Sequence, residues 1–331
     1  MGVFPVRAGR RRSPIVALAP AALLALIAVT PARAADATQW LTRVAQAARQ
    51  YNYIGTIVYQ RGNRVETSRI IHLNQDGKEF EKLVSLDGPA REVVRGQGEV
   101  RFFYPDAKLV RVEPRTFRNV FPSLSPEQQK SLKEYYNFKV VPGERVGGIA
   151  ADSVVFEPKD GLRYGHRFWS DAATGLLLKA RMVNERGDVI EQFAFTDIQV
   201  NAKVDKAMVE PSWPVVPSDW TVKETSAGDV APHATGWVVT RVPPGFTKIM
   251  EGYRKLRGRQ EPVVHLVFSD GLVAVSVFIE PFPAAAVPLG MQSARGGLNI
   301  YSLKLDDSVV TIMGEAPGAT IRQIGNSLAR R

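Results

Sequence analysis

The chain has 331 residues, 45% of them hydrophobic and 23% charged, a balance that excludes a wholly disordered protein. It contains no cysteine, which excludes disulfide bonds, cysteine-ligated metal centres and thiolate catalysis. The formal net charge is +10, but five of these charges are arginines of residues 1–34, a segment without acids, so the +5 that remains is weak support for nucleic-acid binding.

Residues 1–34 have the three-part pattern of a cleaved secretory signal. Arginines between Arg7 and Arg12 form a basic start, an apolar run follows from Ile15 to Val29, and Ala32-Arg33-Ala34 is a small-x-small cleavage site. The alternative is a retained membrane anchor, but a run of about 15 residues is shorter than the ~20 needed to cross a bilayer and is interrupted by Pro20. We therefore expect a secreted mature chain that begins at Ala35.

The mature chain opens with a predicted amphipathic helix, and Asp36 with Gln39 three residues later can cap its start. Apolar residues repeat at helical spacing on one stripe: Trp40, Leu41, Val44, Ala47, Ala48 and Tyr51. From residue 53 to 112 the hydrophobic period changes to two, which predicts strands. Turn signals separate these strands at Gln75-Asp76-Gly77, Asp87-Gly88-Pro89 and Gly96-Gln97-Gly98.

A second helix and a second series of strands follow. Ser125 is a predicted N-cap and Pro126 the first helical residue of a helix that runs toward Tyr135. Strands return over 138–199, with turns at 159–161, 173–175 and 186–188. Because the strands are not separated by regularly alternating helices, the pattern predicts an antiparallel meander with inserted helices, and hence an α+β fold.

Residues 201–235 separate this larger unit from a smaller one. Four prolines and few periodic apolar positions indicate a long linker or an extended covering segment. Beyond it, Val263–Phe268 and Leu272–Ile279 flank Ser269-Asp270-Gly271 as a predicted hairpin, followed by a strand at Val309–Met313 and a closing helix at 318–330. Residues 236–331 contain 11 bases and 7 acids, so +4 of the charge excess lies in the smaller unit.

The sequence contains no recognisable catalytic or metal-binding pattern. The HExxH, GxSxG and P-loop motifs are absent. The histidines show no i, i+2 or i, i+4 pairing of the kind typical of metal sites; they are His72, His166, His233 and His265. His265 lies in mid-strand between apolar neighbours, where a structural histidine is a better interpretation than a metal ligand. The pattern therefore supports neither an enzyme nor a cofactor.

Two features are candidate binding sites. Four cations fall within six residues of the smaller unit: Arg254, Lys255, Arg257 and Arg259. They predict either a solvated loop or a site for lipid phosphates or an acidic partner. The larger unit is rich in aromatic residues, which suit an ordinary core or a sheet curved around an apolar cavity. The candidate lipid-lining residues are Phe102, Tyr104, Phe193 and Phe195.

Several strings together resemble one family. In the larger unit these are Ser85-Leu-Asp-Gly-Pro-Ala-Arg-Glu-Val-Val94 and the block from Gly161 through Trp169-Ser170-Asp171 to Glu191-Gln192-Phe193. In the smaller unit they are Val242-Pro243-Pro244-Gly245-Phe246 and Ser269-Asp270-Gly271-Leu272. In this order, across residues 38–330, they resemble the RseB/MucB family, the periplasmic negative regulators of the envelope-stress sigma factor.

The resemblance implies a periplasmic protein with four parts. These are a signal peptide at 1–34, a larger domain at 35–205 similar to the unclosed β-barrel of the lipoprotein carriers LolA and LolB, a linker at 206–235, and a smaller α+β domain at 236–331.

The resemblance also implies a partner, the periplasmic part of a single-span membrane anti-sigma factor. The family shields that partner from the site-1 protease, and lipid or lipopolysaccharide releases it. No catalytic residue, metal or other cofactor is carried over, and nucleic acid is not an expected partner. The main alternative is a periplasmic lipid or lipoprotein carrier, and a homo-oligomer is left open.

Overall fold

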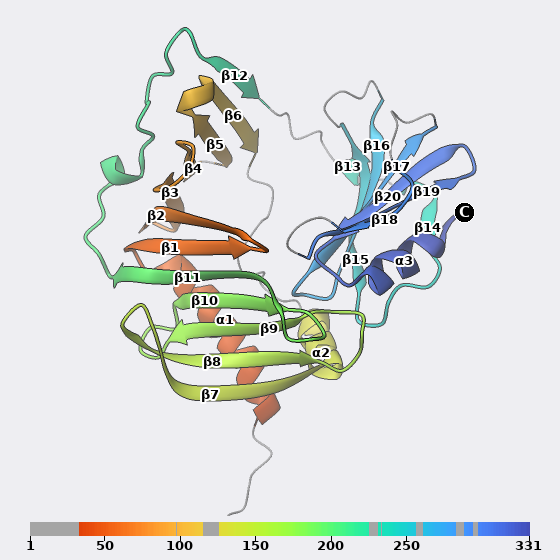
Figure 1. The fold of residues 1–331 in the computed structure, drawn as a ribbon, viewed down its shortest axis with the longest axis horizontal. Helices are drawn as coiled ribbons and strands as arrows, with labels where there is room; N and C mark the ends of the chain where they lie inside the picture. Colours follow the sequence, from red (N-terminus) through yellow and green to blue (C-terminus); the bar gives the residue numbers. More distant parts are fainter. Residues whose placement is uncertain are drawn as a thin grey trace, which may run out of the picture. The chain divides into compact units, whose positions relative to one another are not determined.

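The computed structural model describes residues 33–96, 98–114, 126–224, 231–232, 234–255, 261–282, 288–293 and 297–331. Within these residues the chain forms a twelve-stranded sheet, a seven-stranded sheet and a short two-stranded one (Figure 1). Residues 1–32 of the predicted signal peptide lie outside the described residues, and α1 begins at Arg33. No helix of the described residues is both long and apolar enough to span a membrane.

The larger sheet follows the order β12-β6-β5-β4-β3-β2-β1-β11-β10-β9-β8-β7, so it does not close, and β12 and β7 are its edges. Neighbours are antiparallel except for β12 and β6, which run parallel. This arrangement confirms the predicted open meander and α+β class. The strands are β1 (Tyr53–Arg61), β2 (Arg64–Gln75), β3 (Lys78–Ser85), β4 (Glu92–Gly96), β5 (Glu99–Tyr104), β6 (Leu109–Pro114), β7 (Tyr136–Val146), β8 (Ile149–Pro158), β9 (Gly165–Asp171), β10 (Leu177–Val183), β11 (Val189–Val200) and β12 (Thr221–Glu224).

The predicted turns connect consecutive strands. Between β2 and β3, Asp76 and Gly77 both have positive φ, 53° and 74°, as a tight two-residue hairpin requires. The turn signals at 87–89, 159–161, 173–175 and 186–188 likewise lie between strands. Local turn chemistry therefore accounts for the pairing of strands that follow one another in the chain, but not for the pairing of β1 with β11.

Two helices pack on one face of the larger sheet, which we call the inner face. They are α1 (Arg33–Gln50) and α2 (Pro126–Tyr135). Leu41 and Val44 of α1 pack with Leu132 of α2 and with Phe156 and Phe168 of the sheet. The predicted apolar stripe of the first helix is thus buried against the strands, which confirms its amphipathic character.

Residues 201–224, the covering segment, lie on the opposite, outer face of strands β2 to β6. They include a short 3₁₀ helix, η2 (Lys206–Val209), and end in β12. The Ser212 backbone N–H donates to Glu92 at 2.8 Å, and Trp213 stacks on Phe103 with ring centroids 5.9 Å apart. Of the two predicted interpretations of this segment, a free linker or a cover, the structure has the cover.

The smaller sheet follows the order β13-β15-β16-β17-β20-β19-β18. The predicted hairpin is confirmed by the antiparallel pairing of β16 with β17. Helix α3 (Gly318–Asn326) packs on the sheet through the fully buried Ile321 and Ile324. The strands are β13 (Ala231–Pro232), β15 (Thr247–Arg254), β16 (Val263–Ser269), β17 (Ala274–Pro281), β18 (Gly290–Ser293), β19 (Asn299–Leu305) and β20 (Ser308–Gly314).

The closing helix predicted over 318–330 is too long. It ends at Asn326, and β21 (Leu328–Arg330) pairs with β14 (Trp237–Val239) instead. The unpaired backbone of β14 offers this strand hydrogen bonds that a further helical turn would forgo. Burial of Leu328 in the core of the smaller sheet further favours the strand over a continued helix.

A buried arginine connects the two sheets. Arg163, in the loop between β8 and β9, has a fully buried side chain. It donates to the carbonyl oxygen of Pro244 at 2.5 Å and lies 3.7 Å from the carboxylate of Asp270 in the turn between β16 and β17. The Tyr136 hydroxyl donates to the same carboxylate at 3.1 Å.

Two buried histidines predict how stability depends on pH. Burial lowers the pKa of His166 from 6.5 to about 4, and burial together with Arg254 lowers that of His265 to about 4. The unfolded chain therefore takes up protons first as the pH falls from 6.5 toward 4, and stability is lost over that window. For His166 we expect a loss on the order of 2 kcal/mol between pH 7 and pH 5.

Urea unfolding at pH 7 and pH 5 measures this loss. His166→Phe should reduce the difference between the two pH values because the aromatic ring that replaces the imidazole does not titrate. An unchanged pH difference in His166→Phe would contradict the assignment of this window to His166.

Candidate functional site

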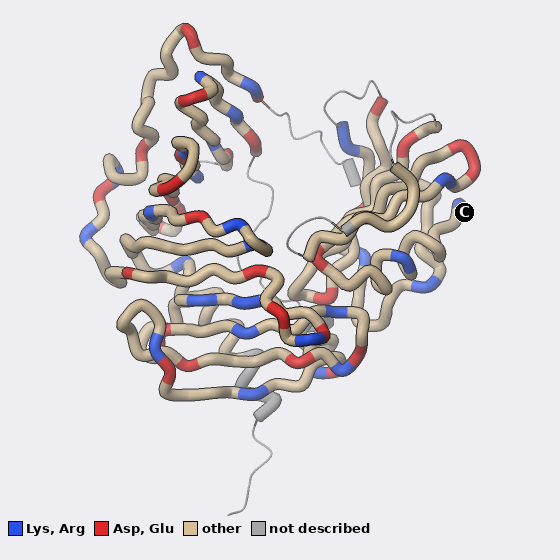
Figure 2. The backbone as a smooth tube through the Cα atoms, in the orientation of Figure 1, with Lys and Arg blue, Asp and Glu red and all other residues tan. Residues whose placement is uncertain are grey.

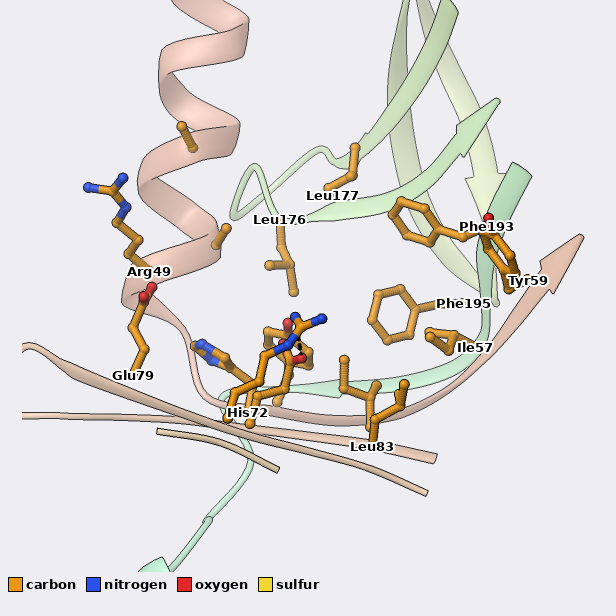
Figure 3. A pocket seen from close by; sticks show the side chains of 16 residues that line it. Arg49, Ile57, Tyr59, His72, Glu79, Leu83, Leu176, Leu177, Phe193 and Phe195 are labelled. Atoms are coloured by element: carbon orange, nitrogen blue, oxygen red, sulfur yellow. Dashed lines mark hydrogen bonds and ion pairs between the residues drawn. The ribbon is translucent and has the colours of Figure 1, made fainter. Parts of the chain in front are cut away.

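A cavity of about 400 Å³ lies between α1 and the inner face of the larger sheet (Figure 3). Its walls come from α1, from β1 to β4, from the start of β10 and from β11, so it collects residues from across the domain. The period of two in each strand directs alternate side chains into it.

Most of the wall is apolar. Phe193 and Phe195 are alternate residues of β11, and Figure 3 shows them at one end of the cavity with Ile57 and Tyr59. Other apolar lining residues come from the helix and the neighbouring strands: Ala45, Ala48, Ile70, Leu83, Leu176 and Leu177. A surface of this kind gains free energy by covering hydrocarbon.

The opposite end of the cavity is polar but balanced in charge. Figure 3 shows Arg49, Glu79 and His72 at this end, below α1. Glu81 and Arg95 also line the cavity and form an ion pair of 2.8 Å. Two arginines thus face two glutamates, so the lining carries no net charge that would attract an anionic head group into the cavity.

Tyr53 and His72 form an aromatic floor that adjoins the polar end. Their rings stack with centroids 4.9 Å apart, Tyr53 meets the edge of Phe195 at 5.9 Å, and the His72 Nδ1 lies 3.0 Å from the Tyr51 carbonyl oxygen. Burial raises the pKa of Tyr53 far above its ordinary value, so its hydroxyl stays neutral. The floor is therefore a fixed aromatic surface.

At the apolar end, Tyr59 is hydrogen-bonded to Glu191, whose pKa is raised by burial and by the nearby Glu315. Arg61 lies between the two carboxylates, 3.6 Å from Glu191 and 2.7 Å from Glu315 of the smaller domain. The lining residue Tyr59 is therefore connected, through Glu191 and Arg61, to Glu315 of the smaller domain.

The arrangement suits an alkyl chain. The cavity volume falls within the range of small-molecule sites, and each buried methylene contributes ~0.8 kcal/mol. Among the described residues no group of three or more His, Cys, Asp or Glu could hold a metal ion. What the cavity can do chemically is bind an apolar group and leave the polar part of the ligand outside.

The candidate lipid-lining residues divide into two pairs. Phe193 and Phe195 line the cavity. Phe102 and Tyr104 lie on β5, outside its lining. Phe102 pairs across the strands with Val93, which pairs with Leu83, so Phe102 shares the inner face one strand beyond the cavity.

The predicted basic cluster is described only in part. Arg254 is the half-buried last residue of β15, and the exposed Lys255 follows it. Arg257 and Arg259 lie outside the described residues. Neither Arg254 nor Lys255 lines the cavity.

The charged lining and the contribution of α1 were not predicted from the sequence. Glu79, Glu81 and Arg95 have the residue types of a solvated strand face, and nothing in their spacing separates a cavity wall from a surface. Strand β2 gave no clear signal either, because the buried Ile70 and His72 are separated by the apolar Ile71. The small Ala45 and Ala48 on α1 could have indicated a helix that leaves room beside it.

Comparison with known proteins gives matches over nearly the whole chain. The model of the MucB/RseB N-terminal domain matches residues 36–213, and the model of the MucB/RseB C-terminal domain matches residues 231–329. The sigma factor AlgU regulatory protein MucB of Pseudomonas aeruginosa is 32% identical over 315 residues, which cover 92% of this chain and 94% of MucB. The sigma-E factor regulatory protein RseB of Escherichia coli K12 is 26% identical over 284 residues, 85% of this chain and 87% of RseB.

Solved structures agree with these matches. A crystal structure of MucB in complex with MucA(peri) has a TM-score of 0.69 at 30% identity and covers 89% of this chain and 99% of that one. A crystal structure of MucB by itself has a TM-score of 0.60 at 30% identity and covers 90% of this chain and 98% of that one. Both domains therefore have counterparts of the same order and fold.

Proposed function

Because the chain belongs to the MucB/RseB family, we propose that it regulates a sigma factor by binding the periplasmic part of a single-span membrane anti-sigma factor. The observation that carries the proposal is the likeness to MucB, which has been crystallised with MucA(peri). In this proposal the bound partner is protected from the site-1 protease.

Lipid in the cavity supplies the release signal in this proposal. The apolar wall binds an acyl chain, as from lipopolysaccharide, while the head group stays outside with its phosphates near basic residues such as Arg254 and Lys255. If lipid weakens anti-sigma binding, the anti-sigma segment must weaken lipid binding by the same free energy. A useful switch needs about 1–3 kcal/mol of coupling, roughly 5- to 150-fold.

Titration in both directions tests this reciprocity. The affinity for the periplasmic anti-sigma domain is measured with and without lipopolysaccharide, and the affinity for lipopolysaccharide is measured with and without that domain. Equal factors in both directions support the proposal. Lipid binding with no effect on partner affinity would contradict the release mechanism.

Filling the cavity should weaken lipid binding without weakening the binding of the anti-sigma partner. Ile57→Trp places an indole among the lining residues, and displacing two methylenes at ~0.8 kcal/mol each weakens binding of a fluorescent fatty acid by roughly tenfold. Partner affinity should persist but no longer respond to lipid. The control is Val58→Trp, which places the same ring on the outer face of β1, and equal loss of lipid affinity in both variants would contradict the site.

A periplasmic lipid or lipoprotein carrier is the second candidate, favoured by the cavity itself. A pull-down from envelope extract with the mature protein distinguishes the two candidates. Recovery of a single-span anti-sigma factor supports regulation, whereas a mixture of lipoproteins supports carriage.

The proposal requires export to the periplasm, with cleavage between Ala34 and Ala35. Intact-mass measurement of the periplasmic protein should give a chain that begins at Ala35. A mass that retains residues 1–34 would contradict the predicted signal peptide.

A further inference from the structure

The outer face of β9 and β10 presents a group of cations that the cavity does not use. Phe168 and Ala180 pack with α1 on the inner face, so their neighbours in the strands point outward. Lys and Arg segments lie side by side on these two strands (Figure 2). The outward residues, here called the cationic platform, are Arg167 and Trp169 on β9 and Lys179 and Arg181 on β10.

The three cations converge on one indole ring. The Arg167 guanidinium carbon lies 4.6 Å from the Trp169 ring centroid, the Lys179 ammonium 4.7 Å and the Arg181 guanidinium carbon 5.6 Å. Arg181 is the direct cross-strand partner of Arg167. Like charges at directly opposite cross-strand positions destabilise a sheet, so the repulsion between Arg167 and Arg181 would be relieved by a bound anion.

One carboxylate neutralises only part of the platform. Arg167 donates to Glu144 at 2.6 Å, and the Arg181 Nε donates to the neutral Gln192 at 3.0 Å. Within the described part of the chain, the Lys179 ammonium has no hydrogen-bond or ion-pair partner. Burial and the adjacent arginines lower its pKa. The platform therefore keeps an excess of two positive charges over Glu144.

No acid lies directly opposite the cations on the β11 side of the platform. On β11 the cross-strand neighbours of Lys179 and Arg181 are Ala194 and Gln192, and the next strand, β1, continues with Val58 and Gln60. Small and neutral side chains thus border the cations on this side. An anion that approaches from this side would meet Lys179 and Arg181 first, whereas Glu144 is already bound to Arg167.

We propose that the cationic platform binds an extended acidic segment of a protein partner whose carboxylates occupy alternate positions. Lys179 and Arg181 are two residues apart on one strand, about 7 Å, and alternate side chains of an extended peptide repeat at the same distance. The aliphatic stems of the cations, which cover the buried Trp169 ring, provide apolar contact for the residues between. The proposed platform depends on the proposed function in one respect only, which is that the partner is a segment of a protein.

Peptide binding to the mature protein tests the platform. A labelled peptide of alternating Glu and Ser should bind more tightly than an isomer with all Glu residues in one block, and its affinity should fall as salt rises. Lys179→Gln with Arg181→Gln should weaken the alternating peptide by about tenfold. The control, Lys78→Gln with Lys203→Gln, removes the same charge from exposed sites of the same domain and should change the affinity by less than about twofold.

Three results would overturn the proposal. They are equal weakening by the two double variants, equal affinity for the two peptides, and displacement of the peptide by inorganic phosphate at an equivalent concentration of negative charge. Thermal melts confirm that both double variants fold, and Lys179→Gln alone provides a milder variant. Binding of the periplasmic anti-sigma domain is measured in parallel, and its absence in wild type with the peptide still bound would refute the proposed function and leave the platform intact.

Discussion

Arg163→Ala is expected to destabilise the protein by about 3–5 kcal/mol, because it leaves the buried carboxylate of Asp270 without its cation. The Asp270 side chain is fully buried, and burial already raises its pKa despite the nearby arginine. The guanidinium also lies over the Tyr135 ring, 4.6 Å from its centroid. The substitution therefore removes the ion pairs with Asp270 and Asp160, the hydrogen bond to the Pro244 carbonyl and this cation–π contact.

Urea unfolding measures the effect, with Arg186→Ala as the matched control. Arg186 forms an ion pair with Asp188 at 3.3 Å, but its side chain is 82% exposed, so the control should lose no more than about 1 kcal/mol. The loss of stability in Arg163→Lys should lie between the losses in Arg163→Ala and Arg186→Ala. Lysine keeps the positive charge but lacks the planar guanidinium group with its several hydrogen-bond donors. Similar losses in Arg163→Ala and Arg186→Ala would contradict the role assigned to burial.

Phe103→Ala is expected to cost about 3–5 kcal/mol, whereas Phe102→Ala should cost about 1 kcal/mol. The two rings are adjacent on β5 but point to opposite faces. Phe103 is fully buried on the outer face against Trp213, which in turn contacts Trp220 with centroids 5.3 Å apart. Phe102 is half-buried and its ring lies 5.9 Å from the Arg111 guanidinium carbon.

Denaturant unfolding of the two variants, followed by tryptophan fluorescence, measures this difference. Loss of the Phe103 ring should also change the native emission, because Trp213 loses its stacking partner, while Phe102→Ala should leave that emission unchanged. Equal stabilities for the two variants would show that the covering segment does not bury Phe103 as described.

The same pair of residues shows how far strand periodicity can be taken. A period of two correctly separates Phe102 from Phe103, but it does not say which face of the sheet is covered. The cover over Phe103 comes from Trp213, 110 positions later in the chain. The proline-rich segment gave no periodic signal for that contact, because its strand pairing with the larger sheet is confined to β12.

The cavity illustrates a second limit. Phe193 and Phe195 were predicted as lining residues because aromatic residues alternate along their strand, and the structure places both in the wall. The charged lining could not be predicted, because Glu81 looks like a surface residue until Arg95 of the next strand lies 2.8 Å away. An ion pair inside a cavity exists only once the register of β3 and β4 is set.

What the sequence alone determined is the local order of this protein: the first helix, the strands between turn signals, the two sheets and the family to which the strings belong. These features depend on hydrophobic periodicity and turn chemistry, which act over a few neighbouring residues. Only the tertiary structure decided that Arg163 meets Asp270, that residues 201–224 form a cover, and that Arg167, Lys179 and Arg181 surround Trp169. Each of these contacts joins residues from different elements of the fold. The energies of the contacts depend on burial and distance, and no single segment of the chain specifies either quantity.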